Sequence, residues 1–161
     1  MRSPRALGTI LVATAALFIA SLAFAAEMTR SEYKQAVEPI CQRNAEANED
    51  ILAGVRGKVQ QGRLKPAGHQ FLRASTALRA TLRKLRQVPQ PAADAETLGE
   101  WLDGVGREAG LLGATGDALV AGKRRGAETL VRKLTEGARE TNALVAGFAF
   151  HHCRLETTVA G

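Results

Sequence analysis

The sequence contains few of the residues that catalysis and cofactor attachment usually require. It has two cysteines and three histidines in 161 residues, and the haem-attachment motif C-x-x-C-H is absent. Beyond residue 25 the only serines are Ser31 and Ser75. Carboxylates are frequent, but their spacing is that of solvated helix surfaces. The sequence therefore predicts a protein that is not an enzyme and that has no cofactor.

Strand-like alternation of polar and apolar residues is also absent over any useful length. Apolar residues recur instead at spacings of three and four, in four successive blocks. This pattern predicts an all-α protein with four helices. We expect one domain over residues 26–161, because a chain of this length is able to bury a single core.

The N-terminus has the pattern of an export signal. Arg2 and Arg5 precede an uncharged, mostly apolar stretch over 6–26, and Ala23-Phe24-Ala25 forms a small-x-small cleavage site. We expect residues 1–25 to be a signal peptide and the protein to be secreted or periplasmic, within the cell envelope. The alternative is that the stretch remains as a membrane anchor, since its length matches the roughly 20 residues that span a bilayer.

Export favours oxidation, so the two cysteines predict a disulfide between Cys41 and Cys153. The alternative is a pair of free buried thiols. A bridge would close a loop of more than 100 residues, which on the chain-entropy model stabilises by roughly 4 to 5 kcal/mol.

The first helix is predicted to begin with a capping box formed by Thr29 and Glu32. Its apolar seam continues to Val55, and Pro39 is expected to kink or interrupt it. The seam residues are Tyr33, Val37, Ile40, Asn44, Ala47, Ile51 and Val55. The second helix starts near Pro66, after Gly62, and ends before the Val88-Pro89-Gln90-Pro91 segment.

The third helix, from about Leu98 to Leu119, is rich in glycine. Gly99, Gly106 and Gly113 are seven apart, so we expect them to let a neighbouring backbone approach closely. The alternative is a locally mobile helix. After a basic turn over 122–126, the fourth helix is expected to end near Cys153, with Val145, Phe148 and His152 on its apolar stripe.

Short connections between four helices favour an antiparallel up-down-up-down four-helix bundle. That topology places the start of the first helix beside the end of the last, where Cys41 and Cys153 are level. The tract Tyr33-x-x-x-Val37-x-Pro39-Ile40-Cys41 with one late cysteine resembles a loose group of uncharacterised bacterial exported helical proteins. The resemblance implies a bridged helical bundle and no particular activity.

Basic residues are concentrated between positions 51 and 93, a segment that contains no acid. Such a face suits an anionic envelope component, whereas export and the absence of interleaved aromatics argue against nucleic acid. The candidate anion-binding residues are Arg73, Arg79, Arg83, Lys84 and Arg86. The alternative is a solvated face that pairs with the acids of the third helix.

His151, His152 and Cys153 bring three metal-binding residue types together. Adjacent helical side chains diverge by about 100°, and a bridged sulfur is no thiolate, so no metal site is predicted there. A haem ligated by Met28 and His152 is disfavoured as well, because Met28 would lie roughly 20 Å further along the bundle. The expected function is a noncatalytic binding or structural role in the envelope, and the alternative is a haem- or metal-carrying bundle.

Overall fold

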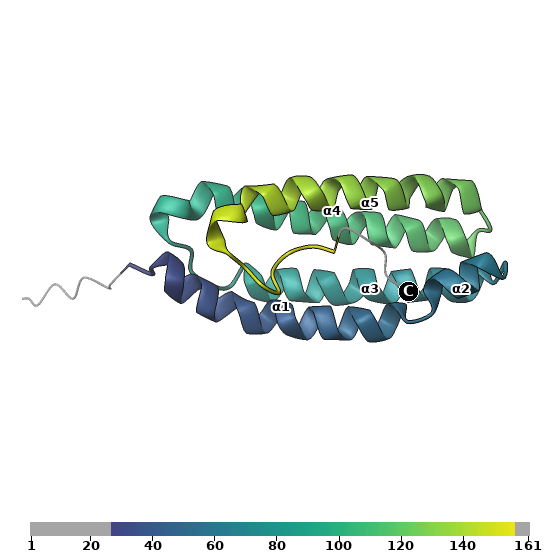
Figure 1. Ribbon diagram of the computed structural model, residues 1–161, viewed down its shortest axis with the longest axis horizontal. Coiled ribbons are helices and arrows are strands. Elements are labelled where there is room, and N and C mark those ends of the chain that lie inside the picture. Colours follow the sequence, from purple (N-terminus) through teal and green to yellow (C-terminus); the bar gives the residue numbers. More distant parts are fainter. Residues whose placement is uncertain (1–26, 157–161) are drawn as a thin grey trace, which may run out of the picture.

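A computed structural model describes residues 27–156, which form an all-α bundle (Figure 1). The predicted signal peptide lies outside the described residues. The long helices are α1 (Arg30–Leu52), α3 (Leu64–Leu85), α4 (Ala95–Val120) and α5 (Arg124–Leu144). The short helix α2 (Val55–Gln60) and the 3-10 turns η1 (Ala92–Asp94) and η2 (Ala146–Phe148) complete the fold. None of the helices in this range is long and apolar enough to cross a bilayer.

The predicted up-down-up-down arrangement is confirmed. α3 packs most extensively against α4, α4 packs against α5, and α1 packs against α3 (Figure 1). α1 and α5 make few contacts with each other. The chain that follows α5 runs back between them, so it closes the bundle on the side where the helices themselves do not meet (Figure 1).

The start of α1 is the predicted capping box. Thr29 Oγ1 accepts a hydrogen bond from Glu32 N, and Thr29 N donates one of 2.8 Å to the Glu32 carboxylate. The predicted interruption at Pro39 is wrong, because α1 continues through it to Leu52. Pro39 and Gln35 both lie on the exposed side of the helix, where water can hydrogen-bond to the carbonyl that the proline leaves free.

α1 ends instead before Gly54, whose φ of +67° suits glycine. The buried Gln70 of α3 holds this end: its side-chain amide donates to the carbonyls of Ile51 (2.7 Å) and Ala53 (3.0 Å). Lys58 Nζ in turn donates to Gln70 Oε1 at 2.8 Å. Val55, predicted on the seam of the first helix, is therefore the first residue of a separate helix, α2.

The fourth long helix is shorter than predicted. α5 ends at Leu144, and Ala149 adopts a left-handed conformation (φ +51°) after η2. The chain then continues without regular secondary structure over residues 149–156, a segment that we call the strap. Phe148, Phe150 and Cys153 are buried, whereas His151 and His152 are exposed. His152 consequently lies on the strap and not on a helical stripe.

Glycines bring α4 close to its neighbours, although mostly not at the predicted positions. An added Cβ on Gly116 would lie 2.8 Å from the Gly68 carbonyl of α3, and one on Gly104 would lie 2.4 Å from Thr141 Oγ1 of α5. Gly99, by contrast, has no neighbouring atom within 4 Å, and Gly106 and Gly113 meet only side chains. Close backbone approach is therefore a property of Gly68 and Gly116.

We expect Gly116→Ala to destabilise the protein by about 1–3 kcal/mol, because the new methyl group would overlap the backbone of α3. The matched variant Gly110→Ala, on the same helix, meets nothing within 4 Å and should stabilise by up to about 1 kcal/mol. Urea unfolding measures both. Equal effects of the two substitutions would show that the α3–α4 approach does not matter.

Candidate functional site

The predicted disulfide is confirmed, and it joins α1 to the strap. The sulfur atoms of Cys41 and Cys153 are 2.00 Å apart, and their Cα atoms are 5.0 Å apart. The sequence placed Cys153 at the end of a helix, whereas the structure places it nine residues past the end of α5 and beyond a turn. The bridge therefore fastens the strap, which runs between α1 and α5, to α1 (Figure 1).

Backbone hydrogen bonds hold the strap on both sides. On the α1 side, the Glu38 carboxylate accepts from the backbone N–H groups of His151 (2.6 Å) and His152 (2.9 Å). On the α5 side, the Asn142 side chain accepts from Leu155 N (2.7 Å) and donates to Leu155 O (2.8 Å). Side chains of two helices therefore hold the backbone of the strap in place.

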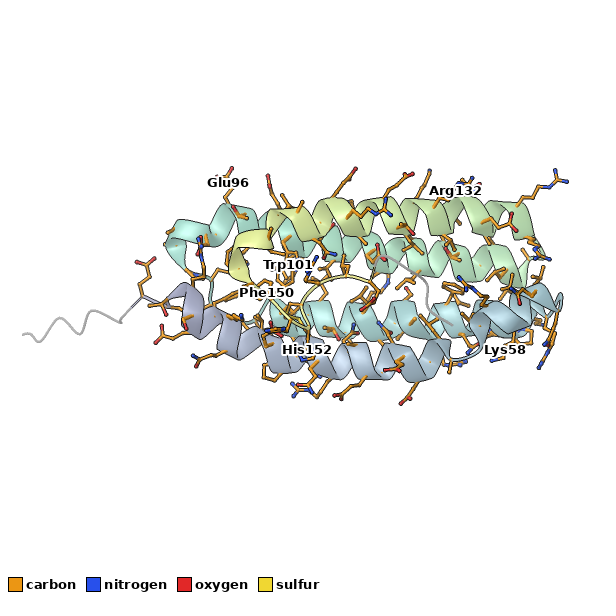
Figure 2. All side chains as sticks on the ribbon, in the orientation of Figure 1. Lys58, Glu96, Trp101, Arg132, Phe150 and His152 are labelled. Carbon is orange, nitrogen blue, oxygen red and sulfur yellow. A yellow bond between two sulfur atoms is a disulfide. The ribbon has the colours of Figure 1, made fainter. Side chains whose placement is uncertain are left out.

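Beneath the start of the strap lies an aromatic cluster (Figure 2). The ring centroids of Trp101 and Phe150 are 5.5 Å apart, and those of Phe148 and Phe150 are 5.4 Å apart. Arg30 lies over the Phe148 ring, 4.6 Å from its centroid, and donates to Asp94 Oδ2 at 2.9 Å. The hydrogen bond and charge of Arg30 hold the pKa of Asp94 below its usual value.

The histidine candidates for a metal site, His151 and His152, are exposed on the strap, and Figure 2 shows His152 near α1. The helical geometry that argued against a shared ion does not apply, because this segment is not helical. Within residues 27–156, however, no three metal-binding side chains are gathered around one point. Met28 packs against the core before α1, and His152 lies beside the disulfide, so the offset along α1 that separates them remains.

A groove opens at the end of the bundle where α2 lies. It has a volume of about 260 Å³ and is bounded by α2, α3, α4 and α5. Its floor is apolar and its mouth is polar. The lining residues are Val55, Arg56, Val59, Gln60, Phe71, Thr115, Leu119, Arg124, Ala127, Glu128 and Val131. The break at Gly54 and the Gln70 cap create this opening, because they direct α2 away from the line of α1 (Figure 1).

The charged groups at the mouth of the groove come from different helices. Arg56 belongs to α2, and Arg124 is the first residue of α5. Arg124 Nε forms an ion pair of 3.3 Å with Glu128, and both side chains are about half exposed. Thr115, at the floor, donates its hydroxyl to the Leu111 carbonyl at 2.8 Å, so its hydrogen is already used.

Two polar residues that face neighbouring helices, Asn44 and Thr141, have packing roles. Asn44 Oδ1 accepts a hydrogen bond of 3.1 Å from Thr81, which links α1 to α3. Thr141 occupies the space that Gly104 leaves free. Thr141 also lines a second hollow on the α4–α5 face, whose other lining residues are Glu100, Asp103, Arg107, Glu140 and Leu144. Neither side chain lies in the apolar groove.

The predicted anion-binding residues are all exposed along α3 and its C-terminal end: Arg73, Arg79, Arg83, Lys84 and Arg86. Arg86 pairs with Asp103 of α4 at 2.8 Å, as expected for a face that meets the acids of that helix. None of the five lines the apolar groove. Arg56 and Arg124, the cations of the groove, were not predicted as site residues, although Arg56 belongs to the acid-free segment 51–93 and Arg124 to the basic turn over 122–126.

One further group stands out by its burial. Glu108, in the middle of α4, is 8 % exposed. Among the described residues no hydrogen bond or ion pair reaches its carboxylate. Burial raises the pKa of Glu108 to about 7.

Comparison with known proteins does not assign a family. No family model, curated protein or solved structure matches this chain. The geometry of the groove, the strap and the charged surface is therefore the basis for any functional conclusion.

Proposed function

We propose that this chain is an exported, noncatalytic binding protein of the cell envelope, and that the end groove is its binding site. The observation that carries the proposal is an open, apolar cavity between four helices with a few polar groups at its mouth. Ligand sites in proteins commonly combine an apolar lining with a small number of polar groups that orient the ligand.

The disulfide supports the location. Structural disulfides persist in oxidising compartments and are rare in the cytosol. The Cys41–Cys153 bridge therefore agrees with the signal pattern over residues 1–25.

The groove chemistry supports binding without catalysis. A catalytic site needs a nucleophile or an acid–base pair within hydrogen-bond reach of the reacting group. The lining contains no serine, cysteine or histidine, the Thr115 hydroxyl donates a hydrogen bond to the Leu111 carbonyl, and Glu128 is paired with Arg124. The remaining lining is an apolar surface with Gln60 and the guanidinium groups of Arg56 and Arg124, which suits the binding and orientation of a ligand.

We expect the groove to bind an uncharged fluorescent probe such as N-phenyl-1-naphthylamine, with enhanced emission on titration. Val131→Phe should weaken this binding at least tenfold, because Val131 lines the groove and the larger ring would occupy it. The matched control is Leu130→Phe, which introduces the same aromatic ring one residue earlier on α5 and outside the lining.

Both variants should retain helical circular dichroism and a cooperative thermal transition. Probe binding that Val131→Phe leaves unchanged would place the binding site elsewhere, and the absence of any binding by the wild-type protein would refute the proposed function.

A further inference from the structure

The fold gathers positive charge at the end of the bundle that holds the groove. Residues 51–66 and residues 121–127 contain no aspartate or glutamate. The first segment forms α2 and the turn into α3, the second forms the α4–α5 turn, and Figure 1 shows both at the same end. Together they supply Arg56, Lys58, Arg63, Lys65, Lys123, Arg124 and Arg125.

This charge surrounds an apolar interior. Val55, Phe71 and Leu119 are each at most 3 % exposed, although they line the groove. Above them Arg56 and Arg124 stand at the mouth, on α2 and α5 respectively. Lys58, labelled in Figure 2, is engaged with Gln70, so its ammonium group serves the cap of α1.

From this arrangement we propose that the groove binds a single-chain anionic amphiphile, such as a fatty acid. The inference rests on the proposed function and adds the chemical class of the ligand. The acyl chain lies against the partly exposed lining residues Val59 and Val131, with the buried floor beneath them. The anionic head lies between Arg56 and Arg124. Guanidinium groups bind carboxylates by charge-assisted hydrogen bonds, and the surrounding lysines and arginines raise the local concentration of anions.

The size of the groove favours one chain. Its volume of about 260 Å³ is below the roughly 300–1,000 Å³ of pockets for drug-sized ligands, so a rigid four-ring compound such as a sterol does not fit. A flat bilayer surface does not fit either, because Val55, Phe71 and Leu119 lie at the bottom of the groove and are almost completely buried. A free or extracted acyl chain can enter where a membrane face cannot.

Glu128 modulates this site. Its carboxylate is the one acid in the lining, and it pairs with Arg124 Nε. A bound anionic head competes with Glu128 for Arg124. Neutralising Glu128 should therefore strengthen the binding of an anion and weaken the binding of a cation.

The test compares decanoate, 1-decanol and decyltrimethylammonium as displacers of the fluorescent probe, each below its critical aggregation or solubility limit. These compounds share a ten-carbon chain and differ in head charge. Decanoate should bind at least tenfold more tightly than either of the others, and increasing salt should reduce this difference.

Four variants locate the head. Arg56→Gln and Arg124→Gln should each weaken decanoate binding by about three- to tenfold while 1-decanol stays within about twofold. Glu128→Gln should strengthen decanoate binding by about threefold, since it releases Arg124. The control Arg125→Gln removes the same charge from the next residue, which does not line the groove, and should change decanoate binding by less than about twofold.

The outcomes separate this inference from the proposed function. Equal affinity for the three compounds, with all three blocked by Val131→Phe, would overturn the anionic class and leave the groove as a binding site. Failure of every compound and of the probe would overturn both. Equal losses in Arg124→Gln and Arg125→Gln would overturn the head position. Sedimentation with anionic phosphatidylglycerol vesicles, without binding of decanoate, would replace a single-chain ligand with a membrane surface.

Discussion

Replacing Cys41 and Cys153 together by alanine is expected to lower the free energy of unfolding by about 4–5 kcal/mol, because the bridge closes a loop of more than 100 residues. The constraint acts mainly on the unfolded chain, whose freedom the loop restricts. Urea unfolding followed by the fluorescence of Trp101, the single tryptophan, measures the difference. At 1 % exposure this side chain reports directly on the core.

The wild-type protein reduced in the presence of a non-thiol reductant is the matched control, and its unfolding curve should superimpose on that of the double variant. Removal of the bridge is also expected to weaken the attachment of the strap to the bundle. Without the bridge, the strap is held by the hydrogen bonds of Glu38, Asn142 and Lys34, the last to the Ala149 carbonyl, and by the packing of Phe150 in the aromatic cluster. A loss below about 1 kcal/mol would show that the unfolded chain gains little freedom when the bridge is removed.

The helices with local signals could be predicted from the sequence. Thr29 and Glu32 form a capping box within four residues, and Gly62 and Gly122 adopt the positive φ values, 75° and 72°, that glycine favours after a helix. The disulfide between Cys41 and Cys153 could be predicted from the expected oxidising compartment and from the order of the helices. In each case the determinant lies within a few residues or follows from the topology as a whole.

The strap could not be predicted in the same way, because its determinants are distant. Val145, Phe148 and His152 fit a helical spacing, and the intervening Phe150 was not counted. Phe148 lies in η2 and Phe150 follows the left-handed Ala149, so a turn that the helical spacing did not indicate brings both rings into the core. The strap is held by Glu38, 113 residues earlier in the chain, whose two acceptor bonds no local pattern reveals.

The groove is also a product of tertiary structure. Val55 continues the apolar spacing of the first helix, and it is also buried as the first residue of α2. The sequence pattern therefore gave no sign of the break at Gly54. Arg56 and Arg124 are 68 positions apart in the sequence, and only the placement of α2 beside the start of α5 brings them to one opening. The sequence pattern drew attention to the basic residues along α3, and their role in anion binding stays a prediction.

Glu108→Gln is expected to increase the free energy of unfolding at pH 8 by about 3 kcal/mol. The carboxyl group of Glu108 is buried within α4, and desolvation raises its pKa from 4.5 to about 7. In the folded state the proton is therefore held more tightly than in the unfolded state. Ionisation at alkaline pH leaves a buried charge that no partner among the described residues compensates.

The pH dependence follows from this difference in proton affinity. Below about pH 4.5 Glu108 is protonated in both states, and its contribution to stability is fully present. Between pH 4.5 and 7 the unfolded chain releases the proton while the folded chain keeps it, so the stability of the wild-type protein falls as the pH rises. Above about pH 7 the loss is complete. Glutamine stays neutral, so the variant should lack this decline.

Unfolding by urea at pH 5 and at pH 8 separates the two behaviours. The variant and the wild-type protein should differ little at pH 5 and by about 3 kcal/mol at pH 8. The matched control is Glu100→Gln, the same substitution at an exposed position of α4, which should change stability by less than about 0.5 kcal/mol. Destabilisation of Glu108→Gln at pH 8 would mean that the folded protein uses the ionised carboxylate, and the buried carboxyl group would then be a binding group and not a desolvated acid.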